Sequence, residues 1–207
     1  MITSSEMQQR RSPHALRDFV VELDDAVRAN EAERHSGILK KGLYKEFLDE
    51  MVPLSIFALN AYPESHKIQP VLGNQGYDAL VFDEKGTEVD RVEMTTPCDG
   101  TAKANDARLV VGRGYGKVEI GTPGDDFDAL FPHVLYVCHK KAKKDYGDCT
   151  LVFAIAPMTP FESFKGKYED QISALVSKMS QIRFKAKRVF LLVMPNRVIE
   201  VHCDRAI

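Results

Sequence analysis

Two carboxylates that the sequence brings face to face are the residues best suited to do chemistry in this chain. Asp78 lies in the run 74–82 and Glu93 in the run 89–95, and a short turn separates the two runs. The pattern predicts antiparallel strands joined by a two-residue loop at 85–86, where a glycine supplies the positive φ that a hairpin turn requires. This loop would place Asp78 directly opposite Glu93, with their Cβ atoms about 4.5–5.5 Å apart.

Carboxylates this close repel each other unless positive charge lies between them, and a divalent cation with oxygen ligands is the commonest partner. Glu46 and Glu50 are four residues apart in an upstream helical run, so they share one helix face, and either is a candidate third ligand. The residues alone leave the simpler alternatives open. The pair at 78 and 93 would then be solvated acids beside a turn, and the two glutamates would belong to a solvated helix face.

The elements that position these acids form one predicted domain. Its parts are a flexible N-terminus at 1–11, a helical N-terminal section at 12–62 and an α/β core at 63–207, which together make up the single domain 1–207. Ser12 and Pro13 are a helix cap and first-turn proline, and apolar residues recur at helical spacing to about residue 33. A second helical run covers 39–59, where Pro53 should kink or divide it.

Two continuous apolar runs, 149–156 and 189–194, predict central strands that are covered on both faces. The other elements expected in the core are a short strand at 68–71, a small hairpin of 109–111 with 117–120, helices at 126–146 and 161–185, and an edge strand at 198–202. The glycines between 112 and 116 precede strand residues instead of a helix, so they predict a turn and not a phosphate-binding loop.

Composition narrows the class of protein. The chain has 207 residues, 44% hydrophobic and 28% charged, with a formal charge of −2, which excludes wholesale disorder and a strongly basic coat but not a local basic groove. No apolar run approaches the roughly 18 residues of a membrane span, so we expect no membrane partner and a cytoplasmic location. The four cysteines are far apart and form no C-x-x-C pair, which favours buried or idle thiols over a zinc site.

The order of these elements resembles that of the PD-(D/E)xK, or restriction-endonuclease-like, nuclease superfamily, over about residues 40–200. The segment 75–79 (Gln-Gly-Tyr-Asp-Ala) is similar to the loop that delivers the first carboxylate of the superfamily motif, and 92–95 (Val-Glu-Met-Thr) is similar to its second half. The resemblance implies an α/β fold with a mixed central sheet flanked by helices. It also implies that Asp78 and Glu93 bind Mg²⁺ or Mn²⁺, that Glu46, with Glu50 as second choice, completes the metal cluster, and that Gln75 steadies the metal or a phosphate.

The chain departs from the motif at Thr95, where the family has a lysine that positions the attacking water and stabilises charge. In this superfamily a neighbouring element sometimes supplies the missing lysine. The candidates are Lys103 and the lysines of the helix at 126–146; among the latter, Lys140 and Lys144 share a face and are taken as catalytic candidates, while Lys141, with Gln75 and Thr95, is assigned to substrate binding.

Two functions follow from the resemblance. The first is a metal-dependent nuclease that hydrolyses phosphodiester bonds of DNA, with RNA left open, and a homodimer is compatible with it because many such nucleases pair up to cut both strands. The second is a catalytically inactive domain of the same fold that acts as a nucleic-acid- or protein-binding module. A third reading, a small-molecule α/β enzyme, has no nucleophile elbow, P-loop or catalytic triad to support it.

Overall fold

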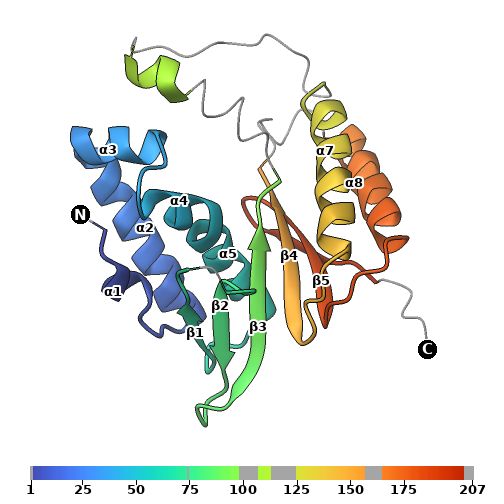
Figure 1. Ribbon diagram of the computed structural model, residues 1–207, viewed down its shortest axis with the longest axis horizontal. Helices are drawn as coiled ribbons and strands as arrows, with labels where there is room; N and C mark the ends of the chain where they lie inside the picture. Colours follow the sequence, from blue (N-terminus) through green and yellow to red (C-terminus); the bar gives the residue numbers. More distant parts are fainter. Residues whose placement is uncertain (1, 74, 98–106, 113–124, 157–164, 203–207) are drawn as a thin grey trace.

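The computed structural model describes residues 2–73, 75–97, 107–112, 125–156 and 165–202 (Figure 1). A six-stranded sheet runs in chain order: β1 (Lys67–Pro70), β2 (Ala79–Phe82), β3 (Glu88–Thr95), β4 (Cys149–Ile155), β5 (Arg188–Val193) and β6 (Arg197–Glu200). The neighbours β3, β4 and β5 are parallel, and the remaining pairs are antiparallel. The prediction of an α/β protein with a mixed central sheet is confirmed at this level.

Helices cover both faces of the sheet (Figure 1). The N-terminal group is α1 (Ser4–Met7), α2 (Pro13–Ala29), α3 (Glu31–Ile38), α4 (Tyr44–Glu46), the π-helical turn η1 (Phe47–Met51) and α5 (Val52–Ala61), and the later helices are α7 (Asp125–Ala142) and α8 (Lys165–Ser180). The N-terminal group packs on one face of the sheet to form the first hydrophobic core, and α7 and α8 pack on the other face to form the second.

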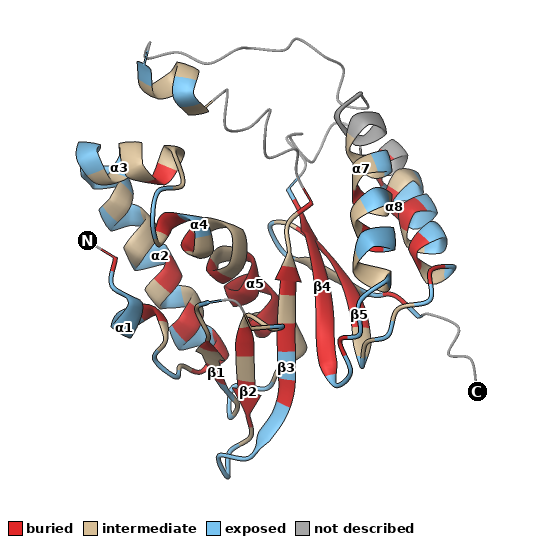
Figure 2. Ribbon diagram, in the orientation of Figure 1, coloured by how far each residue is buried: buried red, intermediate tan, exposed pale blue. Residues whose placement is uncertain are grey.

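The position of β4 at the centre of the sheet explains why its sequence is apolar apart from Thr150. Leu151 and Phe153 point into the core under α7 and α8, whereas Val152 and Ala154 point into the core of the N-terminal helices. Side chains alternate between the faces of a sheet, so a strand covered on both sides is apolar except where a buried polar side chain has a hydrogen-bond partner. Figure 2 shows β4 buried along its length.

The N-terminal section differs from the prediction in two places. Residues 2–11 are not a flexible tail, because α1 buries Met7 completely and Arg11 pairs with Ile68 at the edge of the sheet. The first long helix ends earlier than expected because Asn30 caps α3, its side chain accepting a hydrogen bond from the Glu33 N–H at 3.1 Å. Gly37 lies inside α3.

The predicted small hairpin is also wrong where it can be judged. Residues 107–112 are helical, so Leu109–Val111 is not a strand, and residues 117–120 lie outside the described residues. Short apolar runs of this kind do not distinguish a strand from a buried helical turn. Cys138 and Cys149 are free and buried, as expected of idle thiols, and the other two cysteines lie outside the described residues.

Within the part of the chain that the structure describes, no helix is both long enough and apolar enough to cross a bilayer.

Candidate functional site

The hairpin register predicted from the sequence is confirmed over its central positions. Ala79 pairs with Val92, and the Asp78 N–H donates to the Val92 carbonyl at 2.7 Å, so the ladder continues towards Asp78 and Glu93. The two-residue loop is wrong, because the register shifts after Val81 and the loop widens to residues 83–87. The shift falls beyond the pairs that set the position of the two acids, so it does not move them.

Asp78 is held at the edge of this ladder by one strong hydrogen bond. Its Oδ2 accepts from the Met94 N–H at 2.7 Å. Burial, together with the negative charges of Glu93 and Glu50, raises the pKa of the carboxyl to about 7, against the opposing effects of that hydrogen bond and of Lys141. Three carboxylates therefore lie close enough to act on one another electrostatically.

Glu50 reaches this group from η1, the π-helical turn between α4 and α5. Pro53 has no N–H to donate to the carbonyl four residues earlier, that of Asp49, and this missing bond favours a locally widened helix. The Asp49 oxygen instead accepts a hydrogen bond from Thr96 Oγ1 at 2.8 Å. This bond ties the turn that carries Glu50 to the end of the strand that carries Glu93.

Glu50 is the helical acid that acts on the other two, whereas Glu46 was the first choice from the sequence. Burial raises the pKa of Glu50 to about 7, with Glu46 as the largest charge contribution and Glu93 among the smaller ones. Glu46 lies behind it in α4, and its Oε2 is buried without a hydrogen-bond partner among the described residues.

The cation of the site is Lys141, near the C-terminal end of α7. Its Nζ lies 2.6 Å from Glu93 Oε1, with the lysine side chain 20% exposed and the glutamate side chain 13% exposed. The same ammonium lies 5.5 Å from the ring centre of Tyr146. Burial lowers the pKa of Lys141, but the hydrogen bond and the charge of Glu93 outweigh it, so the net shift is upward and the ammonium stays charged.

Two further predicted site residues carry buried polar atoms without a partner in the described part of the chain. These atoms are Gln75 Nε2 and Thr95 Oγ1. Gln75 packs against Gly73, whose φ of +125° favours glycine and where a Cβ would meet Gln75 Oε1 at 3.1 Å. A buried polar atom without a hydrogen bond costs about 1–3 kcal/mol. Such atoms are expected where a ligand supplies the missing partner.

The structure does not bring the predicted catalytic lysines to the acids. Lys140 and Lys144 are both exposed. Lys144 lies beyond the end of α7 at Ala142, and Lys140 is on the outer face of the helix, whereas Lys141 is rotated from Lys140 by about 100° towards the sheet. Lys103 lies outside the described residues. Among the described side chains, no three His, Cys, Asp or Glu residues are arranged so that they could already hold a metal ion.

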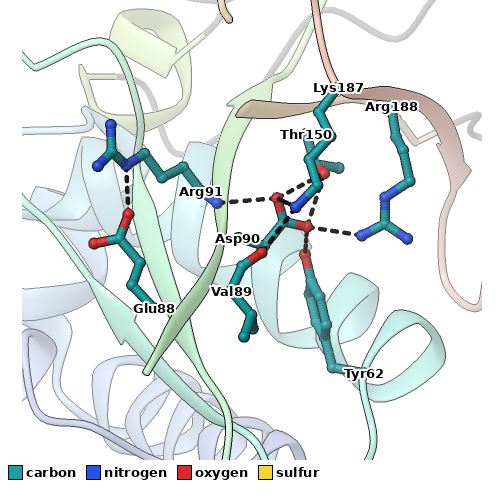
Figure 3. A network of polar contacts seen from close by, with 8 residues as sticks. All are labelled: Tyr62, Glu88, Val89, Asp90, Arg91, Thr150, Lys187 and Arg188. Carbon is teal, nitrogen blue, oxygen red and sulfur yellow. Dashed lines mark hydrogen bonds and ion pairs between the residues drawn. The ribbon is translucent and has the colours of Figure 1, made fainter. Parts of the chain in front are cut away.

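Sequence reasoning missed a second charged cluster, on the other face of β3 (Figure 3). The Asp90 side chain is only 2% exposed, and its Oδ2 accepts from Tyr62, Thr150 and Arg188 at 2.8, 2.8 and 2.7 Å. Lys187 Nζ lies 3.3 Å from Oδ1. The signal was present: Asp90 has the same strand parity as the buried Val92 and Met94, so alternation alone places it inward.

Comparison of this chain with models of protein families, with curated proteins and with solved structures finds no match. The fold and the site therefore define the class of protein only as mixed α/β, with an acidic cluster and the partly buried Lys141 beside the central sheet.

Removing the charge of Asp78 is expected to stabilise the metal-free protein above neutral pH. A folded-state pKa of about 7, against an ordinary value of 3.8, means that the folded state binds the proton more tightly. Stability is then lost as pH rises from about 4 through 7. We expect Asp78→Asn to raise the free energy of unfolding by about 2 kcal/mol at pH 8 and by almost nothing at pH 4.

Urea unfolding in a chelating buffer at both pH values measures this difference. Glu84→Gln, in the exposed loop of the same hairpin, is the matched control and should change neither value. A less stable Asp78→Asn protein at pH 8 would mean that the Met94 N–H bond to the carboxylate outweighs the repulsion.

Proposed function

We propose that this protein is a metal-dependent nuclease with a restriction-endonuclease-like fold, and that it hydrolyses phosphodiester bonds of DNA. The observation that carries the proposal is the meeting of Asp78, Glu93 and Glu50 with the Lys141 ammonium, from a hairpin, a helix of the N-terminal section and α7. A group of carboxylates suits a metal ion that assists phosphodiester hydrolysis, and a partly buried ammonium beside it suits stabilisation of the developing charge. Lys141 takes the part of the lysine that Thr95 replaces.

The donor set fits Mg²⁺ or Mn²⁺. All the candidate ligands are carboxylate oxygens, which hard divalent cations prefer. A positive ion would offset both the burial and the mutual repulsion that raise the pKa of Asp78 and Glu50. Asp78 and Glu93 would hold the ion directly, and Glu50, backed by Glu46, would complete the set. The unpartnered Gln75 Nε2 is a donor suited to a phosphate oxygen.

The residues divide the chemistry as follows. When bound, the metal would polarise a phosphodiester oxygen and lower the pKa of the attacking water. Lys141, which stays protonated, would place positive charge where negative charge develops on the phosphate. Glu93 orients that ammonium through the 2.6 Å contact, and burial of the group by Tyr146 strengthens each of these interactions.

The test is cleavage of supercoiled plasmid by the purified protein. Nicked and linear products are expected with Mg²⁺ or Mn²⁺ and not with a chelator, and a labelled RNA in a parallel assay decides between the two nucleic acids. If neither DNA nor RNA is cut with any divalent ion, the nuclease proposal is overturned.

A second candidate, a catalytically inactive binding module, is favoured by one specific observation. Lys141 already neutralises Glu93, and no three-ligand group is formed among the described residues. A protein used only for binding would retain such an ion pair permanently. In that case divalent ions would not raise the melting temperature, whereas a nuclease of the proposed kind is stabilised by the ion that it binds.

Lys141→Met is expected to lower the rate of cleavage at saturating plasmid about a hundredfold, because it removes charge stabilisation at the phosphate and leaves a similar apolar stem. Lys178→Met, on the exposed face of α8, is the matched control and should cut at the wild-type rate. Melting curves for both variants separate this effect from instability caused by leaving Glu93 without its partner. Equal rates for the two variants would remove Lys141 from the mechanism.

A further inference from the structure

The outer face of α7 carries an exposed aromatic side chain. Tyr136 is 64% exposed, the most of any large hydrophobic side chain among the described residues. The ring of His133, one helical turn earlier, lies with its centre 6.3 Å from that of Tyr136. Val134 and Cys138, on the opposite face, are completely buried in the core. The tyrosine is therefore not part of the packing that holds the helix on the sheet.

Lysines follow this tyrosine in the last turn of α7 and directly after it. Lys140, Lys143 and Lys144 are all exposed, and none of them forms an ion pair with a described residue. His133, Tyr136 and Lys140 share one face of α7, and Lys143 and Lys144 lie just beyond the end of the helix at Ala142, so the aromatic side chains are followed by three cations. The stripe of His133, Tyr136, Lys140, Lys143 and Lys144 adjoins Lys141, which reaches inward to Glu93 at 2.6 Å.

We propose that this stripe binds single-stranded DNA, with backbone phosphates against the three lysines and an unpaired base stacked on Tyr136. The charges are complementary, since the lysines form a local positive patch in a chain whose formal charge is −2. A duplex keeps its bases stacked on each other, so it would use the lysines and leave the tyrosine without a role. Exposed aromatics interleaved with cations are the arrangement that binds single strands.

The stripe has the dimensions for a short strand segment. From His133 to Lys140 α7 rises about 10 Å, which is the length of about three stacked nucleotides. A strand held there passes the Lys141–Glu93 pair at the inner edge of the helix. Binding of a strand here would deepen the proposed function. The binding itself is independent of that function, and only the fate of the bound strand rests on it.

The test measures binding without cleavage. Fluorescence anisotropy in a chelating buffer compares a labelled oligothymidine, an oligouridine of the same length and a DNA duplex. Wild-type protein is expected to bind oligothymidine most tightly. Tyr136→Ala should weaken that binding about tenfold and leave duplex binding unchanged, whereas Tyr136→Phe, which keeps the ring, should retain the wild-type affinity.

The lysines are tested by the triple variant Lys140→Gln, Lys143→Gln, Lys144→Gln. It should weaken binding of every nucleic acid and reduce the salt dependence of the single-strand affinity by about 2 in the log–log slope. Val21→Ala, an exposed apolar residue on α2, is the control that should change nothing. Tighter binding of oligouridine than of oligothymidine would reassign the ligand to RNA and overturn the DNA proposal.

Unchanged single-strand affinity in Tyr136→Ala, or equal affinity of the wild type for duplex and single strand, would also overturn the proposal. The assay is independent of the nuclease test. If the protein binds oligothymidine through Tyr136 but cuts nothing, the binding surface is supported and the nuclease proposal is overturned. If the protein cuts DNA but meets none of the binding criteria, the nuclease proposal is supported and the binding surface is overturned.

Discussion

Asp78→Asn is expected to reduce metal-dependent DNA cleavage about a thousandfold, which corresponds to about 4 kcal/mol of lost transition-state stabilisation. The amide keeps the shape of the side chain, and its oxygen can still accept from the Met94 N–H. The substitution removes one of the negative charges that a divalent cation needs, so the ion would be held weakly and in the wrong place. Initial rates of plasmid nicking in Mg²⁺ measure the effect.

The pairing of activity with stability makes this result diagnostic. The same substitution is expected to stabilise the metal-free protein at pH 8, so loss of activity cannot be attributed to unfolding if the melting temperature rises. Glu84→Gln should retain both the activity and the stability of the wild type. Wild-type cleavage by Asp78→Asn would show that the nicking comes from a contaminant or from another site, and the proposed cluster would be rejected.

The part of this site that could be predicted from the sequence is the part set by local periodicity. The residues of the turn and the alternation of side chains fix which positions of a hairpin face each other, and a slip by one residue would turn buried side chains outward. The register around Ala79 and Val92 was therefore predictable, and with it the meeting of Asp78 and Glu93. The bulge after Val81 was not, because Asp83 shapes the loop by accepting from Lys85 and Thr87 N–H groups.

The rest of the site depends on contacts between distant elements. The choice of Glu50 over Glu46 depends on a π-turn that Pro53 favours and that Thr96 secures from the end of β3. The choice of Lys141 over its neighbours depends on how α7 is rotated against the sheet. Helical spacing says that Lys140 and Lys144 share a face, but it does not say which face points to the acids. Only the packing of α7 on the second core determines that.

The polar cluster around Asp90 is the feature on which the fold of β3 depends most. It joins the loop after α5, through Tyr62, to β4 and to the start of β5, through Thr150 and Arg188 (Figure 3). Three groups donate to one oxygen of a carboxylate that is almost completely buried, so the charge is stabilised only while its partners remain in place. Burial and the charge of Asp90 also raise the pKa of Tyr62, which keeps its hydroxyl protonated as a donor.

Asp90→Ala is expected to lower the free energy of unfolding by about 3–5 kcal/mol, because it leaves the Arg188 guanidinium and two hydroxyl donors without their shared acceptor. For a chain of this size the melting temperature should fall by about 10 °C or more. Glu88→Ala, two residues earlier in β3, removes an exposed ion pair with Arg91 and should cost less than about 1 kcal/mol. Thermal unfolding at neutral pH compares the two. A loss as small as that of Glu88→Ala would mean that water replaces the carboxylate, and that apolar packing around β3 holds the strands together without the cluster.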